Sequence, residues 1–120
     1  MRNMSFRLTT DQIAEQTKTV TRRFGWPNLK AGDLLQPIVK GQGLKKGEKV
    51  QRIGPPIRIL SATTVALDTI DAADCILEGF PHLHPDAFIL MLVYESGCRE
   101  DAPVNRIEFE YTDKPGKATS

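Results

Sequence analysis

Residues 18–23 of this 120-residue chain read Lys-Thr-Val-Thr-Arg-Arg, so six positions hold three cations and two hydroxyl side chains. Three of the six residues are β-branched, which favours a strand. In a regular strand Thr19, Thr21 and Arg23 share one face. Three cations this close repel one another unless an anion or an acidic partner lies nearby. The stretch therefore predicts either a solvated edge strand with surface ion pairs or a site for a polar, anionic ligand.

The side chains of this stretch fit a ligand that carries phosphate or carbonyl groups. Arg23 offers a planar fork of donors that suits a phosphate or a carbonyl edge, and Thr21 places a hydroxyl beside it. Arg22 and Thr19 are further candidate ligand-binding residues. Trp26, a few positions later, is a candidate stacking face for a base, although an aromatic residue there also fits core or rim packing.

The rest of the chain predicts an α+β domain rather than a doubly wound sheet. The expected order is strand, helix, several strands, two helices and a final strand, without βαβα alternation. We therefore expect a small mixed β-barrel with short helices covering its openings. The single domain spans residues 1–111, and residues 112–120 form a polar, loose tail. The expected helices are 10–16, 71–77 and 85–94, and the expected strands are 5–8, 18–24, 34–39, 57–67 and 104–111.

Local signals support several of these boundaries. Asp71 is a good N-cap, and Gly79 suits the left-handed position that ends a helix. Pro85 fits the first turn of the next helix, which Gly97 closes. In the strand expected over residues 57–67 the odd-numbered positions are mostly apolar, but Ser61 interrupts that face without a reason in the sequence.

Composition excludes several classes of protein. The net charge is +1, so general coating of DNA is not expected, although basic residues cluster unevenly. No apolar run approaches the ~20 residues of a membrane span, and residues 1–7 show no secretory signal, so a cytoplasmic protein is expected. Cys75 and Cys98 fit reduced thiols, and geometry alone decides whether they form a disulfide.

The basic segment 40–52 is a candidate contact for nucleic-acid phosphates. Lys45 and Lys46 stand there among three glycines, but the Gly-x4-Gly-Lys-Ser/Thr spacing of a phosphate-binding Walker loop is absent. The alternative is a mobile, solvated hairpin tip. His82 and His84 have no third histidine or cysteine pair near them, so neither a metal site nor a cofactor is expected.

Lys18, Thr21 and Arg23 match three defined positions of the pattern Gly-x-Lys-x-x-Thr-x-Arg, and the chain resembles the ASCH-domain family of PUA-like proteins. Gln16 stands where the pattern has its first glycine, a departure at the turn from helix to strand. Residues 30–33, Lys-Ala-Gly-Asp, resemble the family's Lys-x-Gly-Asp turn. Residues 65–70, followed by a helix ending at Glu78, extend the likeness over most of the chain.

The resemblance implies a PUA-like barrel whose cleft binds RNA or a nucleotide-like ligand. It also implies an alternative, because one branch of the family consists of small amidohydrolases that deacetylate N(4)-acetylcytidine. Their catalytic lysine, threonine and glutamate fall on Lys18, Thr21 and Glu78. Thr21 would then be the nucleophile, Lys18 the base that activates it, and Glu78 the group that orients the proton, while Arg23 steadies the substrate.

Two physical points bear on these implied roles. Lys18 and Thr21 are three positions apart, so they can meet only if Lys18 lies at the junction between helix and strand. Glu78 lies at a helix C-terminus, where the helix dipole disfavours a negative charge, which suggests a specific role. The alternative is a surface glutamate before a glycine cap. We expect RNA or nucleotide binding, with amidohydrolysis as the alternative, and the nucleic-acid interpretation depends on a closed sheet.

Overall fold

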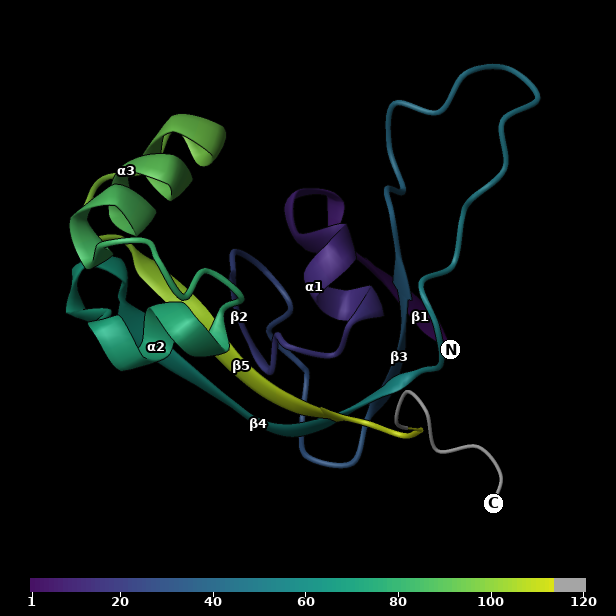
Figure 1. The fold of residues 1–120 in the computed structure, drawn as a ribbon, viewed down its shortest axis with the longest axis horizontal. Helices are drawn as coiled ribbons and strands as arrows, with labels where there is room; N and C mark the ends of the chain where they lie inside the picture. Colours follow the sequence, from purple (N-terminus) through teal and green to yellow (C-terminus); the bar gives the residue numbers. More distant parts are fainter. Residues whose placement is uncertain (114–120) are drawn as a thin grey trace.

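The computed structural model describes residues 1–113, which form one mixed sheet with short helices around it (Figure 1). The elements are β1 (Arg2–Ser5), η1 (Arg7–Thr9), α1 (Thr10–Ala14), β2 (Val20–Arg23), β3 (Leu34–Ile38), β4 (Ile57–Ala66), η2 (Leu67–Thr69), α2 (Ala72–Leu77), α3 (Pro85–Ser96) and β5 (Pro103–Tyr111). The predicted α+β class is confirmed. Of the predicted tail, residues 114–120 lie outside the described residues, and Thr112 donates a hydrogen bond to the carbonyl of Pro56.

The sheet is open. Its strand order is β1-β3-β4-β5-β2, with β1 parallel to β3 and the other pairs antiparallel. Because β1 and β2 are the two edges and do not pair in the described part of the chain, a closed barrel is not shown. Figure 1 places α2 and α3 together at one end of the long β4–β5 ribbon, with α1 between them and β1–β3.

A bulge in β4 explains the interruption at Ser61. Ile59 pairs with Phe109, but the next pair joins Ser61 to Glu108, so Leu60 is an extra residue in the ladder. A bulge changes which side chains face the core. The prediction of one continuous apolar face is therefore wrong beyond Ile59: Ala62 packs on the core, and Thr63 is exposed.

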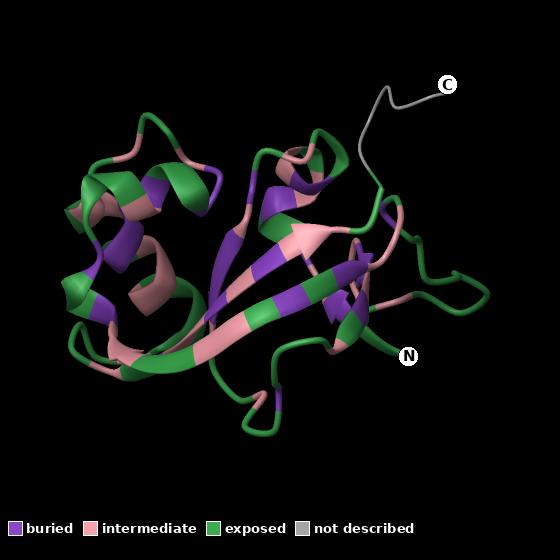
Figure 2. Ribbon diagram, turned by 90° about the horizontal axis from the view of Figure 1, so that it is seen from below, coloured by how far each residue is buried: buried purple, intermediate pink, exposed green. Residues whose placement is uncertain are grey.

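The buried side chains form two apolar clusters, and Figure 2 shows buried residues on the strands and on the helices. The first joins the sheet to α1, and its Phe6 and Phe109 rings lie 6.0 Å apart. The second joins α2 and α3 to the far ends of β4 and β5, with Phe88 at its centre. Charged side chains fill the seam between these clusters, and the candidate site is built there.

Local helix signals are confirmed, whereas the first strand is misplaced. The carboxylate of Asp71 accepts from the backbone of Asp74 at 2.8 Å, and Gly97 ends α3 at φ 72°. The strand predicted over residues 5–8 is wrong, because pairing with β3 fixes β1 at Arg2–Ser5 and residues 7–9 turn into a 3-10 helix. Among the described residues, no helix has the length and apolarity needed to cross a membrane.

The turn after α1 has a left-handed residue at Gln16, with φ 60°. This is the position where the ASCH pattern has glycine, the residue that adopts such a conformation without steric cost. The side-chain amide of Gln16 donates to the carbonyl of Asp113 at 2.6 Å. The turn that leads into Lys18 is therefore left-handed at Gln16, a conformation that glycine adopts more easily.

We expect Gln16→Gly to be more stable than Gln16→Ala by about 1 kcal/mol, the cost of a left-handed conformation for a residue with a Cβ. Both variants lose the amide hydrogen bond, so their difference isolates the backbone contribution. Denaturant titration of the two variants measures it. Equal free energies of unfolding would show that this turn carries no strain.

Candidate functional site

Lys18 lies at the junction between α1 and β2, outside the regular strand, as its implied role requires. Its side chain is buried, with 3% of the residue exposed. The surrounding backbone is fixed on two sides, because Thr19 donates to the carbonyl of Leu77 and accepts from the amide of Phe109. The hydroxyl of Tyr111 donates to the carbonyl of Lys18. This anchoring aims the long lysine side chain inward instead of into solvent.

Glu78, the residue that ends α2, is the buried acid of the site. Only 2% of it is exposed, so the alternative of a surface glutamate is wrong. Its carboxylate lies 2.8 Å from Nζ of Lys18 and 3.0 Å from Nη1 of Arg22. Nζ of Lys18 also donates to the backbone carbonyl of Glu78 at 2.7 Å. One acid therefore holds two buried cations, a geometry that offsets the unfavourable helix dipole.

Glycine at position 79 lets the end of α2 approach α1 closely. Gly79 has φ 96°, and a Cβ built there would lie 2.9 Å from Cγ of Gln12. The side-chain amide of Gln12 donates to the carbonyl of Gly79 at 3.1 Å. The glycine predicted as a helix cap therefore also sets how near Glu78 comes to Lys18.

Burial shifts the protonation of the two pocket cations. The pKa of Lys18 is lowered because burial removes hydration from its charged form, while Glu78 opposes this shift. Burial also lowers the pKa of Arg23 to about 10. Arg23 therefore stays charged at neutral pH, and Lys18 is closer to losing its proton than an exposed lysine.

A chain of charges extends from Glu78 to the surface of the sheet. Arg22 donates to Glu78 and also to a carboxylate oxygen of Asp74 at 2.6 Å. Arg106 on β5 holds the same carboxylate through Nε at 2.8 Å and Nη2 at 3.0 Å. These hydrogen bonds, that from Arg106 first, lower the pKa of Asp74 to about 2. Arg22, predicted to bind ligand, is thus occupied by two acids.

Arg23 connects the two open edges of the sheet. It lies on edge strand β2, and its Nη2 donates at 2.5 Å to the carbonyl of Ser5 on edge strand β1. Its Nε donates to the hydroxyl of Thr21 at 3.0 Å, and its guanidinium lies 4.6 Å from the centre of the Phe6 ring. A side chain thus spans the gap that backbone pairing leaves open.

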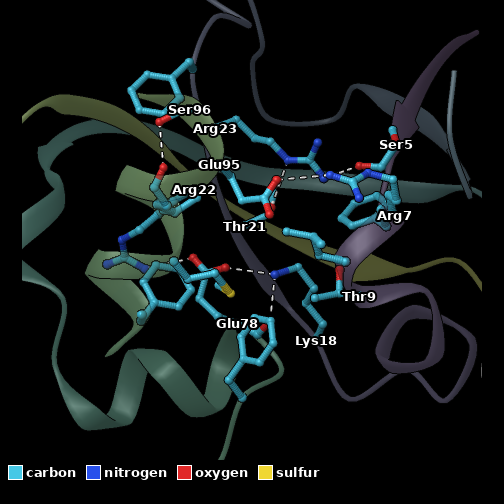
Figure 3. A pocket seen from close by; sticks show the side chains of 17 residues that line it. Ser5, Arg7, Thr9, Lys18, Thr21, Arg22, Arg23, Glu78, Glu95 and Ser96 are labelled. Atoms are coloured by element: carbon cyan, nitrogen blue, oxygen red, sulfur yellow. Dashed lines mark hydrogen bonds and ion pairs between the residues drawn. The ribbon is translucent and has the colours of Figure 1, made fainter. Parts of the chain in front are cut away.

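These residues line one cavity, which we call the cleft, with a volume of about 280 Å³. Figure 3 shows Lys18 and Glu78 pointing toward each other, with Thr21 and Arg23 on the neighbouring wall. Aromatic residues from both apolar clusters complete the cleft. Its lining consists of Ser5, Phe6, Arg7, Leu8, Thr9, Lys18, Thr21, Arg22, Arg23, Phe24, Glu78, Phe80, Phe88, Met91, Leu92, Glu95 and Ser96. The structure therefore brings together the four residues that the sequence singled out.

The remaining predicted site residues lie outside the cleft. Thr19 is held through its backbone and does not line the cavity. Lys45 and Lys46 are exposed on the segment between β3 and β4, which projects from the body of the protein (Figure 1). Trp26 is half-buried and lies under the guanidinium of Arg2 at 5.1 Å. Residues 1–113 contain no group of three or more His, Cys, Asp or Glu side chains that could hold a metal ion.

Sequence reasoning missed the pair that borders the cleft, Arg7 and Glu95, whose side chains lie 3.2 Å apart. Glu95 comes from α3 and follows Phe88, Met91 and Leu92 at intervals of one helical turn. That spacing places Glu95 on the same helix face as those residues and could have revealed it. Arg7 carried no comparable signal, since it was assigned to a strand.

Comparisons with known proteins find two curated proteins that resemble this chain over half of their length and a solved structure with a similar fold. No family model matches the chain. It is 32% identical over 97 residues to an adenylate kinase of Rhizobium meliloti (strain 1021), covering 74% of this chain and 50% of that protein. The chain is also 31% identical over 97 residues to an adenylate kinase of Sinorhizobium medicae (strain WSM419), again covering 74% of this chain and 50% of that protein. The chain thus spans half the length of these curated relatives.

A solved structure resembles nearly the whole chain. Protein EF3133 from Enterococcus faecalis V583, described by the family model DUF984, aligns with a TM-score of 0.63. The alignment covers 94% of this chain and 77% of that one at 16% identity. The two proteins share a fold. At this identity the likeness carries no information about ligand or activity.

Replacing Glu78 with glutamine should destabilise the protein by about 3 kcal/mol or more, because Lys18 would be buried without an acidic partner and Arg22 would keep only Asp74. Glu110→Gln is the matched control: its partner Arg58 lies 3.3 Å away, but both side chains are nearly half exposed. The free energy of unfolding of that control, measured by denaturant titration, should fall by less than about 1 kcal/mol. Similar losses in both variants would contradict a buried ion pair.

Asp74 should make stability dependent on acid pH. Its folded pKa of about 2 lies below the ordinary value, so the stabilisation is present above about pH 4 and is lost as pH falls toward 2. Asp74→Asn should be less stable than the wild type at pH 6, and its stability should change less between pH 4 and pH 2. Thermal unfolding across this range measures the slopes. Parallel curves for the two proteins would disprove the assignment.

Proposed function

We propose that this protein binds RNA or a nucleotide-like ligand in the cleft lined by Lys18, Thr21, Arg23 and Glu78. The convergence of these four polar groups between aromatic walls supports this function most strongly. Such a cavity fixes a base by stacking on rings and by hydrogen bonds to its edge. Its volume of about 280 Å³ suits a single base or nucleoside, so an RNA ligand would insert one unstacked base.

Each polar group has a distinct part in this proposal. Arg23 presents donors to a carbonyl or phosphate, because its described contacts use Nε and Nη2 and leave Nη1 available. Glu78 offers acceptor oxygens for a base amino group, while Lys18 and Arg22 hold its carboxylate in place. Phe24, which is 43% exposed beside the cleft, provides a ring on which a base can stack.

The proposal includes membership of the ASCH-domain, PUA-like group. Its support is that the pattern residues Lys18, Thr21 and Arg23 all line the cleft, and that Gln16 adopts the conformation expected of the pattern's glycine. In this view Arg23 occupies the seam at which a PUA-like sheet would close. The closed sheet on which the sequence interpretation of nucleic-acid binding depended is not shown, so the RNA proposal rests on the cleft, whose two sheet edges are joined by the hydrogen bond from Arg23 to Ser5.

The names of the curated relatives support a nucleotide ligand but do not extend phosphoryl transfer to this chain. The match covers half of each adenylate kinase. The chain also lacks the Gly-x4-Gly-Lys-Ser/Thr loop that cradles phosphates in P-loop proteins. Adenosine monophosphate therefore belongs among the ligands tested, and kinase activity is not part of the proposal.

Amidohydrolysis of an N(4)-acylated cytidine is the second candidate, supported by the burial of Lys18 and its lowered pKa beside Thr21 and Glu78. Thr21 would attack the acyl carbonyl, and Lys18, once neutral, would accept the hydroxyl proton and return it to the departing cytidine amine. Water would then hydrolyse the acyl ester of Thr21 and release the carboxylic acid. In the resting structure Lys18 contacts Glu78 and Thr21 contacts Arg23, so the ligand must bring the two groups together.

Calorimetric titration with cytidine, N(4)-acetylcytidine, adenosine monophosphate and a short single-stranded RNA tests the proposal. We expect at least one ligand to bind, with affinity reduced about tenfold or more in Arg23→Gln. Arg58→Gln, on β4 outside the cleft, is the matched arginine control and should bind normally. The N(4)-acetylcytidine sample is then analysed for cytidine, whose formation should vanish in Thr21→Ala. A folded protein that binds none of these ligands would refute the proposed function.

A further inference from the structure

A second hollow adjoins the cleft and shares part of its wall. This outer hollow has a volume of about 580 Å³, and its lining includes Ser5, Arg7, Arg23, Trp26 and Lys40. Ser5, Arg7 and Arg23 line both spaces. A ligand held in the cleft would therefore meet the outer hollow on passing Arg23.

The lining of the outer hollow is cationic. Arg7, Arg23 and Lys40 contribute to it, and no aspartate or glutamate of residues 1–113 does. Two of these cations have acidic partners outside the hollow, Glu95 for Arg7 at 3.2 Å and Glu48 for Lys40 at 3.9 Å. Both pairs are solvent-exposed and therefore weak, so an incoming anion can compete with them. The hollow thus favours a negatively charged group.

Trp26 gives the same hollow an aromatic wall. It is the chain's single tryptophan, packs against the first apolar cluster and has φ 60°. A non-glycine residue in this conformation is held by its surroundings, and Arg2 covers its ring at 5.1 Å. Because the core and Arg2 both lie against Trp26, its indole offers the hollow apolar contact for a sugar or base, while the three cations attract the phosphate.

We propose that the outer hollow binds the phosphate of a nucleotide whose base occupies the cleft. This inference rests on the proposed function and narrows its substrate class to a phosphorylated nucleoside, free or within a strand, in place of a free nucleoside. Arg23 lines both spaces and so lies where base and phosphate would meet, and Arg7 and Lys40 contribute further charges to the outer hollow. Arginine forks and a lysine charge together suit a phosphate's oxygens.

Matched ligands and variants test this assignment. Cytidine and adenosine are each compared with their 3′- and 5′-monophosphates by calorimetry and by the emission of Trp26. At least one monophosphate should bind tenfold or more tightly than its nucleoside, more weakly with added salt, and should change Trp26 emission. Lys40→Gln and Arg7→Gln should each reduce that ratio about threefold or more, and Lys40→Gln, which lies outside the cleft, should leave nucleoside affinity unchanged. Lys45→Gln, on the same projecting segment but outside the hollow, should leave it unaltered.

A dinucleotide is titrated as well, to distinguish a phosphate within a strand from that of a free nucleotide. If the dinucleotide binds more tightly than the monophosphate, the ligand is a strand. If the two bind equally, the ligand is a free nucleotide. The inference is overturned when a nucleoside binds but its monophosphates bind no more tightly, or when Lys45→Gln lowers the ratio as much as Lys40→Gln. Both of those results leave the proposed function standing. Absence of binding by nucleosides, nucleotides, the dinucleotide and the short RNA alike overturns the proposed function and this inference together.

Discussion

The site depends on one buried acid, Glu78, placed between Lys18 and Arg22. Removing three charged groups from water costs several kcal/mol for each ion, so the arrangement is stable only because every charge has a short, direct partner. Glu78 is also the last residue before Gly79, where the backbone turns too closely on α1 to admit a side chain. The ion pairs therefore join α2 to β2 and bring the two apolar clusters together around a polar seam.

The cleft follows from this seam. Backbone pairing ends at β1 and β2, and the side chain of Arg23 reaches from one edge to the other. A closed sheet would satisfy these edges through backbone hydrogen bonds and leave less space for a ligand. Here the opening is bordered by cations and aromatic rings, and it continues past Arg23 into the outer hollow. The candidate site is thus a direct consequence of how the sheet stays open.

Much of the site was predictable from local patterns, and the rest depended on distant pairing. The helix caps at Asp71 and Gly97 are local signals, and the structure confirms them. The resemblance placed Lys18 and Glu78 in one site, although they are 60 residues apart. The bulge that reverses the face of β4 and the open edges of the sheet arise from strand register, which a single strand's sequence does not encode. The sequence predicts that Arg22 binds a ligand, because the two acids that pair with it, Asp74 and Glu78, lie far along the chain and their proximity is not visible in the sequence.

A thermodynamic double-mutant cycle between Lys18 and Glu78 tests most directly whether the buried ion pair holds the cleft together. Free energies of unfolding are measured for the wild type, Lys18→Met, Glu78→Gln and the double variant. We predict a coupling of about 2 kcal/mol or more, because Glu78→Gln leaves Lys18 buried without its acid, a cost that the double variant does not have, while Arg22 keeps Asp74 in all four proteins. A coupling near zero would show that the two side chains do not depend on each other, and it would contradict the central place of Glu78 in the cleft.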